Sequence, residues 1–377
     1  MDRRIFLKTS GIAAAALSVS SAFLLGSGCN SKGKIKMKWR IYELQLVNPF
    51  TIAYSTRKTS ENVLVEMEYD GVKGYGEASV PIYLHETPET VMRFLREVDL
   101  SPFVPTQIDE ILEYVDGLKE ENTAAKTSID IALHDLAGKI NNQACYAMFG
   151  LKREDAPNTT YTIGIDPVEV IKEKTQAVAG KFKILKVKLG SDHDKEIIEA
   201  VRSVTDLPLC IDANQGWKNK EQALDMIAWL KEKGVVMVEQ PMAKDDFESA
   251  AWITERSPLP IYADEAAQRL KDLERLKGAY NGFNIKIMKC TGLREAWKMI
   301  EFGRKNNLKV MIGCMLETSC ANSAAAQLSP AADFADIDSA MYLSNDCFSG
   351  MKIVDGKITL PDAPGIGITL TVENLFA

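Results

Sequence analysis

The sequence predicts an α/β fold, a (β/α)8-type barrel preceded by an α+β domain, and two patterns support this prediction. After residue 158, short apolar segments alternate with amphipathic segments, which is the rhythm of parallel strands and their covering helices. Before that residue, strand-like segments come first and helical segments follow. An open, doubly wound sheet is the less favoured alternative, because no Gly-x-Gly-x-x-Gly motif follows any expected strand.

The α+β domain is expected over residues 37–157. Residues 62–69 and 74–77 alternate as strands do, and the Asp70-Gly71 pair before the second of them predicts a hairpin turn. From Pro88 to Ile140 the apolar residues recur with the helical period instead. We therefore expect strands first and helices second in this domain.

The barrel is expected over residues 158–345. Its eight strands are expected at residues 161–165, 184–189, 209–211, 235–238, 261–263, 283–285, 310–312 and 335–337. The helices between them are expected at residues 168–180, 194–204, 220–232, 247–256, 270–276, 293–306 and 320–328. Residues 346–377 are strand-like and rich in turns, and we expect them to return to the α+β domain and complete it.

Residues 1–36 are expected to serve as an export signal and tether outside the folded body. Arg3-Arg4 precedes an apolar run, residues 12–25, that is shorter than the ~20 residues a membrane-spanning helix needs. The arginine pair indicates the twin-arginine export route. The small residues before Cys29 resemble a lipoprotein cleavage box, although Gly26 stands where an apolar residue is usual. We expect a periplasmic protein with a lipid anchor at Cys29; an uncleaved membrane anchor is the alternative.

Composition excludes some partners and metals. The net charge of −7, with no basic stripe in the body of the chain, argues against a nucleic-acid partner. Six further cysteines are scattered without the spacing of a disulfide framework, so we expect buried free thiols. The chain has only three histidines, which disfavours a zinc site.

Charged residues stand at the C-terminal ends of successive expected strands. Lys188, Asp212, Glu239, Asp264 and Lys286 are 24, 27, 25 and 22 residues apart, about one strand–helix unit each. Because barrel active sites are built at this end of the strands, we expect the five side chains to meet at one mouth. A single charge after a strand often marks only the protein surface, but five in succession are hard to explain in that way.

The residue types predict the chemistry. The carboxylates of Asp212, Glu239 and Asp264 would offer three hard oxygen ligands on adjacent strands, which suits Mg²⁺. Lys188 and Lys286 would flank the metal on opposite sides and could move a proton next to a substrate carboxylate. Lys186, which alternates with Lys188, would help to lower the pKa of that lysine by its like charge.

Five motifs occur in an order that resembles the muconate-lactonizing subgroup of the enolase superfamily, an established example of a lysine base beside Mg²⁺. The motifs are Lys-x-Lys, Asp-x-Asn, Glu-Gln-Pro, Ala-Asp-Glu and Asn-Ile-Lys-x-x-Lys, and the helix at residues 130–138 resembles the capping-domain signature of that group. The resemblance covers residues 37–377. It implies that Asp212, Glu239 and Asp264 bind the metal and that Lys188 and Lys286 are the acid/base pair, with Lys289 a less favoured base.

Two further segments resemble those of dipeptide epimerases. Asp336-Ile-Asp338 resembles the Asp-x-Asp that holds the ammonium group of a dipeptide, and two carboxylates at a barrel mouth favour a cation. Residues 49–57 resemble the mobile capping loop of the epimerases that act on L-Ala-D/L-Glu, so Arg57 is expected to meet a side-chain carboxylate; an ordinary exposed arginine is the alternative. A second loop, residues 81–85, is expected to close over the substrate. Glu317 is either a residue behind the site or a helix cap.

The sequence therefore predicts a Mg²⁺-dependent epimerase that inverts the α-carbon of the C-terminal residue of a dipeptide such as L-Ala-D/L-Glu, in the reuse of cell-wall peptides. An N-acylamino-acid racemase or a cycloisomerase explains Asp336 and Asp338 less well, since their substrates carry no ammonium group. A lipid-anchored peptide-binding protein without catalysis would not need both Lys188 and Lys286. A purely structural barrel leaves all these charges unexplained. We expect association into a homo-oligomer.

Overall fold

The computed structural model describes residues 33–52 and 55–377. Cys29, the arginine pair and the expected apolar run lie outside these residues. Within them, no helix is both long and apolar enough to cross a membrane.

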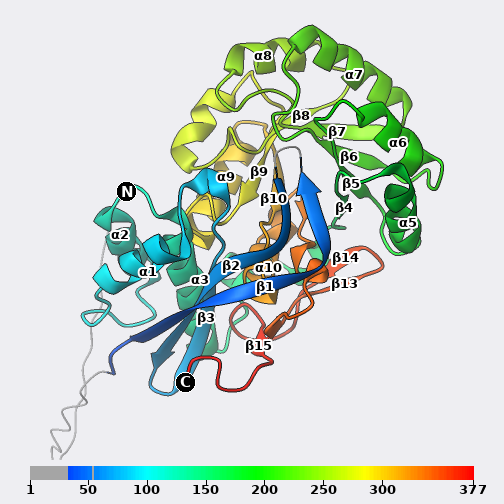
Figure 1. Cartoon of the computed structure of the whole chain (residues 1–377). Helices are drawn as coiled ribbons and strands as arrows, with labels where there is room; N and C mark the ends of the chain where they lie inside the picture. The colour runs from blue at the N-terminus through cyan, green and yellow to red at the C-terminus, as the bar shows by residue number, and fades with distance from the viewer. Residues whose placement is uncertain (1–32, 53–54) are drawn as a thin grey trace, which may run out of the picture. The chain divides into compact units, whose positions relative to one another are not determined.

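A three-stranded antiparallel sheet begins the described chain. Its strands, β1 (Lys36–Ile52), β2 (Ser55–Tyr69) and β3 (Val72–Ala78), lie in the order β1-β2-β3. Asp70 and Gly71 form the predicted hairpin turn, both with positive φ. The far ends of β1 and β2 extend as a ribbon to the barrel (Figure 1), where the amide of Ile165 donates to the carbonyl of Thr51 at 3.1 Å.

Four helices complete the first domain: α1 (Pro88–Glu97), α2 (Ile108–Leu118), α3 (Thr123–Ile140) and the short α4 (Cys145–Met148). Helix α3 is buried over nearly its whole length because it lies between the sheet and the barrel. Its small residues allow a close approach: a Cβ at Gly76 of β3 would lie 1.9 Å from the carbonyl oxygen of Ser128. The prediction of strands followed by helices is therefore confirmed.

Eight parallel strands form the second part in the order β4 to β11. Their bounds are β4 (Tyr161–Ile163), β5 (Leu185–Lys188), β6 (Leu209–Asp212), β7 (Val235–Glu239), β8 (Ile261–Ala263), β9 (Gly282–Lys286), β10 (Lys309–Gly313) and β11 (Phe334–Asp336). The amide of Thr160 donates to the carbonyl of Ala335 at 3.0 Å, which brings the two edge strands together and nearly closes the barrel. All eight strands lie where the sequence predicts them.

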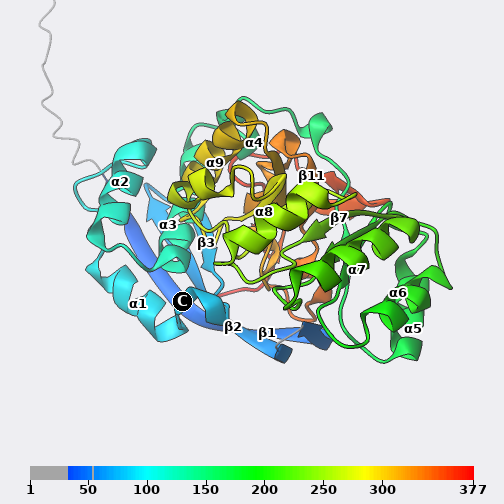
Figure 2. The ribbon, with the colours of Figure 1, turned by 90° about the horizontal axis from the view of Figure 1, so that it is seen from above.

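Eight helical segments of the described chain connect the barrel strands. They are α5 (Val168–Val178), α6 (Asp194–Arg202), α7 (Lys220–Glu232), α8 (Phe247–Arg256), η3 (Leu270–Leu276), α9 (Leu293–Lys305), α10 (Ser319–Ala326) and the short η4 (Ser329–Ala331). From above, α5, α6 and α7 lie on the side of the barrel away from α1 and α2 (Figure 2). One expectation needs correction: η3 is a 3-10 helix, because a seven-residue amphipathic segment does not distinguish the two helix types.

The segment after β11 contains the 3-10 helix η5 (Ser339–Tyr342) and four short strands: β12 (Phe348–Ser349), β13 (Lys352–Val354), β14 (Lys357–Thr359) and β15 (Thr369–Leu370). It returns to the first domain as predicted, since Arg40 of β1 donates to the carbonyl of Leu375 at 2.6 Å. The ring of Phe348 lies 5.5 Å from that of Tyr75. The six cysteines of the described chain are free and mostly buried, also as predicted.

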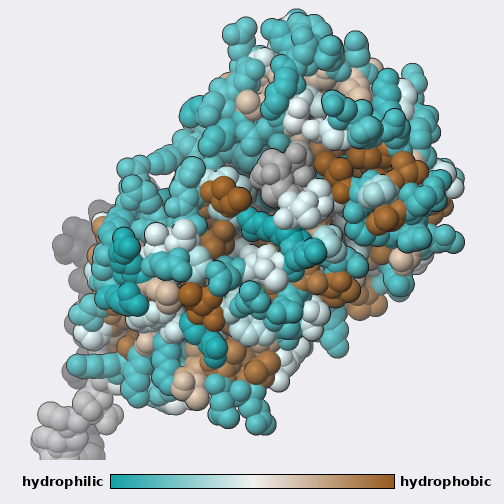
Figure 3. All heavy atoms as spheres, viewed as in Figure 1, coloured by the Kyte–Doolittle hydropathy of each residue, from teal (hydrophilic) through white to brown (hydrophobic). Residues whose placement is uncertain are grey.

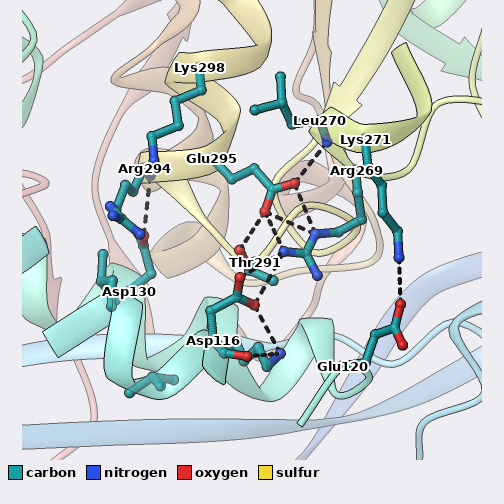
Figure 4. A pocket seen from close by; sticks show the side chains of 13 residues that line it. Asp116, Glu120, Asp130, Arg269, Leu270, Lys271, Thr291, Arg294, Glu295 and Lys298 are labelled. Atoms are coloured by element: carbon teal, nitrogen blue, oxygen red, sulfur yellow. Dashed lines mark hydrogen bonds and ion pairs between the residues drawn. The ribbon is translucent and has the colours of Figure 1, made fainter. Parts of the chain in front are cut away.

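An ion-pair network joins the first domain to the loops of the barrel (Figure 4). The guanidinium of Arg269, after β8, contacts Glu295 at 2.6 Å and Asp116 of α2 at 3.1 Å. The ammonium of Lys126, buried on α3, contacts the same Asp116 at 2.9 Å. Thr291 donates to Glu295 at 3.0 Å. The network holds the loops after β8 and β9 against the first domain, and these loops follow two strands of the candidate site.

Candidate active site

One cavity at the C-terminal ends of the barrel strands brings most of the predicted site residues together. The ribbon of β1 and β2 contributes Phe50 and Arg57, and the segment after β3 contributes Ile82 and Tyr83. The barrel contributes Lys188, Asn214, Asp264, Glu265, Lys286, Asp336, Asp338 and others. On the face of the molecule shown in Figure 3, apolar side chains are exposed among hydrophilic ones. Val47, Ile82 and Met341 are among the exposed large apolar residues.

Three carboxylates meet at the base of the mouth. Asp212 ends β6, Glu239 ends the neighbouring β7, and Asp264 follows β8. All three are buried, and one oxygen from each lies within 4.8 Å of the others. Burial together with the charge of Asp212 raises the pKa of Glu239 to about 7, and its Oε2 lies 2.7 Å from the ammonium of Lys186. A divalent cation would satisfy this set, and three hard oxygen ligands fit Mg²⁺.

Lys188 and Lys286 flank these carboxylates from two sides of the barrel. Lys188 ends β5, and its Nζ lies 2.6 Å from Asp212 Oδ2. Lys286 ends β9, four strands away, and its Nζ lies 2.8 Å from Asp264 Oδ2. Burial opposes the charge of Lys286, but the neighbouring Asp264 outweighs it and raises the pKa of that lysine. A lysine base near neutrality therefore requires a cation that competes for Asp264.

Lys186 does not line the cavity, but its ammonium contacts the same oxygen of Asp212 as that of Lys188, so the two like charges lie close together. Its Nζ lies 2.7 Å from Glu239, 2.7 Å from Asp336 and 3.1 Å from Asp212, deep inside the barrel. The alternation of a strand puts Lys186 and Lys188 on the same inward face, and both ammonium groups reach Asp212 Oδ2, at 3.1 and 2.6 Å. Lys186 thus neutralises the carboxylates from behind.

Asp336 and Asp338 lie in the same cavity, at the end of β11 and just beyond it. Asp336 accepts from Thr160 Oγ1 at 2.6 Å and from Lys186 at 2.7 Å. Asp338 accepts from the amide of Thr162 at 2.7 Å and from the hydroxyl of Tyr342 at 2.5 Å. Burial and the charge of Asp336 raise the pKa of Asp338 to about 6. The pair still offers negative charge to a cation at neutral pH.

Family models match both parts of this chain. One is described as the mandelate racemase / muconate lactonizing enzyme N-terminal domain and matches residues 35–150. The other, an enolase C-terminal domain-like model, matches residues 169–374, more than half of the chain. The chain belongs to the enolase superfamily. The resemblance seen in the ordered motifs is therefore confirmed.

Relatives within this superfamily resemble the chain over most of its length. An L-Ala-D/L-Glu epimerase of Bacteroides thetaiotaomicron is 54% identical and covers 97% of this chain and 99% of its own. The L-Ala-D/L-Glu epimerase of Escherichia coli is 34% identical over 84% of this chain and 96% of its own. A dipeptide epimerase of Cytophaga hutchinsonii, solved with Mg and D-Ala-L-Val, has a TM-score of 0.85 and 26% identity, covering 92% of this chain and 97% of that one.

Of the other predicted residues, Arg57, Lys289 and Glu317, Arg57 alone lines the cavity. Arg57 lines the cavity, and no carboxylate of the described residues pairs with it. Lys289 is buried and donates to Asp264 Oδ1 at 2.6 Å, and it is not among the residues that line the cavity. Glu317 is buried behind the mouth and accepts from the amide of Met315. It is not the cap of α10, because the Thr318 side chain holds that position.

Sequence reasoning did not single out Asn214, Glu265, Thr162 or Tyr342, all of which line the cavity. Asn214 and Glu265 stand inside motifs that were recognised, Asp-x-Asn and Ala-Asp-Glu, so their spacing could have indicated them. No pattern in the sequence marks Tyr342, which reaches Asp338 only because η5 turns directly after β11.

Proposed function

We propose that this protein is a Mg²⁺-dependent dipeptide epimerase whose substrate is L-Ala-D/L-Glu or a similar dipeptide. One observation carries the proposal: a single cavity is lined by two lysines, by Asp264 of the carboxylate triad that lies between them and, across the barrel, by a pair of carboxylates suited to an ammonium group. The activities named for the relatives support it. Mg²⁺ on the triad would supply positive charge for the substrate carboxylate.

The two lysines account for inversion. Lys188 and Lys286 extend from strands on opposite sides of the barrel, so each faces one side of an α-carbon held between them. One lysine takes the α-proton, and the other, in its ammonium form, returns a proton to the opposite face. Exchange of their roles gives the reverse reaction, as an epimerase requires.

The ends of the cavity select the substrate. Asp336 and Asp338 lie on the β11 side and would hold the ammonium group of the first residue, which leaves the α-carbon of the second residue for the lysines. An N-acylated amino acid has no ammonium group and would leave both buried carboxylates without this partner. For that reason we favour a dipeptide over the substrate of an N-acylamino-acid racemase, although a racemase of N-succinyl-L-Arg/Lys from Bacillus cereus is 30% identical over 74% of this chain.

Proton NMR in D₂O with Mg²⁺ and L-Ala-L-Glu tests the proposal. We expect loss of the glutamate α-proton resonance together with resonances of the other diastereomer. An unchanged spectrum with this dipeptide, with a set of other dipeptides and with N-acyl amino acids would overturn the proposal and favour a peptide-binding protein.

Arg57 is predicted to select an acidic second residue. Replacement by glutamine (Arg57→Gln) removes a charged partner of the glutamate side chain, and such hydrogen bonds contribute about 1.5–3 kcal/mol. We expect kcat/KM for L-Ala-L-Glu to fall roughly 10- to 100-fold, with little change for L-Ala-L-Leu. Lys58→Gln, at the exposed neighbouring position outside the cavity, is the matched control. Equal losses on both dipeptides in Arg57→Gln would contradict the role in specificity.

We also propose that the protein is exported by the twin-arginine route and anchored through a lipid on Cys29, as the composition of residues 1–36 predicts. Cell-wall peptides would be available to it in the periplasm. Mass spectrometry of the mature N-terminus tests this proposal, and a mature chain that retains unmodified Met1 or Cys29 would contradict the lipid anchor. Association into a homo-oligomer stays a prediction, which a measurement of the molecular mass in solution would test.

A further inference from the structure

Two side chains on the cavity wall carry buried oxygen atoms that accept no hydrogen bond among the described residues. They are Asn214 Oδ1 and Glu265 Oε2. Asn214 is 6% exposed and Glu265 is 3% exposed, and both line the cavity. An unsatisfied buried acceptor destabilises the folded protein, so native proteins keep few of them. The pair therefore indicates a hydrogen-bond donor that the chain itself does not supply.

The two residues stand directly beside the carboxylate triad. The amide of Asn214 donates to Asp212 Oδ1 at 3.0 Å, and Glu265 follows Asp264 in the chain. Asn214 Nδ2 donates to Glu265 Oε1 at 3.3 Å, which links the ends of β6 and β8 across the end of β7. The two oxygens without a hydrogen bond, Asn214 Oδ1 and Glu265 Oε2, are therefore carried by one hydrogen-bonded pair of side chains beside the triad.

The backbone around the pair is held in a costly conformation. Asn214 and Gln215 have φ of 42° and 64°, and Gln240 has φ of 39°, all in the left-handed region. Such conformations are unfavourable in residues other than glycine and persist where surrounding contacts fix them. Here the side chain of Gln240 accepts from the amides of Asp264 and Ala266, at 2.9 and 3.1 Å, and fixes the turn that carries Glu265.

We propose that Asn214 and Glu265 accept hydrogen bonds from water carried by Mg²⁺ at the triad. This inference rests on the metal requirement of the proposed function. Mg²⁺ takes six ligands and usually keeps several waters, so three protein carboxylates and a substrate carboxylate leave room for water. The hydrogens of that water need acceptors, and the pair provides two beside the triad. The ammonium of a dipeptide has its own acceptors, Asp336 at the end of β11 and Asp338 just beyond it, and β11 lies four strands from β7.

Acceptors around a metal site commonly change its affinity by 10- to 100-fold, and this sets the expected size of the effect. Glu265→Gln keeps the shape of the side chain and the acceptor for Asn214, but turns the free oxygen into a donor. Asn214→Leu keeps the volume and removes both polar atoms. We expect each variant to bind Mn²⁺, used as the probe, about 10-fold more weakly. Because the two residues share a hydrogen bond, the fold-loss of Mn²⁺ affinity in the double variant should be smaller than the product of the fold-losses in the two single variants.

The test measures Mn²⁺ binding to the full chain by isothermal titration calorimetry, without substrate or turnover, and checks folding by circular dichroism. Glu86→Gln is the matched control. Glu86 is also a buried carboxylate, but its oxygens accept from the amides of Ala124 and Ala125, far along the chain from the triad. Its Mn²⁺ affinity should equal that of the unchanged protein.

Thermal midpoints with and without Mn²⁺ give a second measurement, and the shift caused by the metal should be smaller in both variants than in the unchanged protein. Folded Glu265→Gln and Asn214→Leu proteins with unchanged Mn²⁺ affinity would overturn the inference and leave the proposed function intact. Failure of the unchanged protein to bind Mn²⁺ or Mg²⁺ would instead contradict the metal requirement of the proposed function itself.

Discussion

Replacement of Lys188 or Lys286 by alanine is expected to lower the rate of dipeptide epimerisation by at least about 10³-fold, because general acid–base groups commonly contribute 10²- to 10⁴-fold and inversion needs both. The two variants should differ in what they retain. A single remaining lysine can exchange the α-proton of only one epimer with D₂O. We therefore expect Lys188→Ala to retain exchange with one of L-Ala-L-Glu and L-Ala-D-Glu, and Lys286→Ala to retain exchange with the other.

Proton NMR with each epimer separately measures both quantities and assigns each lysine to one face of the α-carbon. Lys231→Ala, an exposed lysine on α7, is the control and should leave both conversion and exchange unchanged. If both variants lost exchange with both epimers while remaining folded and able to bind Mg²⁺, a two-base mechanism would be untenable.

Periodicity predicts the barrel well because each strand is short, apolar and followed by an amphipathic helix. The bounds of α7 and α8, for example, agree with prediction to the residue. The ribbon formed by β1 and β2 is less predictable. Residues 55–62 are polar, and residues 55–57 belong to the segment that resembles a mobile capping loop. A two-stranded ribbon exposed on both faces buries little, so its sequence need not alternate between apolar and polar residues.

The positions of the charged residues were predictable because the ends of parallel barrel strands meet at one mouth. The depth of each residue in the barrel was not predictable. Lys186 and Lys188 occupy equivalent alternating positions in the sequence, yet Lys186 lies behind the triad and Lys188 lines the cavity. Depth depends on how neighbouring strands are staggered in the closed barrel, which residue spacing within one strand does not contain. The free oxygens of Asn214 and Glu265 are likewise a property of three-dimensional neighbours.

Removal of divalent cations by EDTA is expected to abolish epimerisation, by at least about 10³-fold, while the protein stays folded. Loss of activity follows because the substrate carboxylate would otherwise meet three carboxylates without a cation, and such charge stabilisation contributes several kcal/mol. Folding should survive because lysines already neutralise the triad. Nitrogens of Lys186, Lys188, Lys286 and Lys289 lie 2.6–3.1 Å from its oxygens.

The NMR assay and the thermal midpoint, measured before EDTA, after it and after added Mg²⁺, separate these two expectations. Activity should return with Mg²⁺, and the thermal midpoint should rise only by the amount expected when an ion binds the folded state and not the unfolded state. Glu239→Gln should reproduce the loss of activity at saturating Mg²⁺, whereas Asp333→Asn, a carboxylate outside the cavity that pairs with exposed Lys309, should not. Full activity in EDTA would contradict the metal requirement. Unfolding in EDTA would show instead that the lysines do not offset the charge of the triad. The barrel would then need the ion to hold the carboxylates of Asp212, Glu239 and Asp264 together.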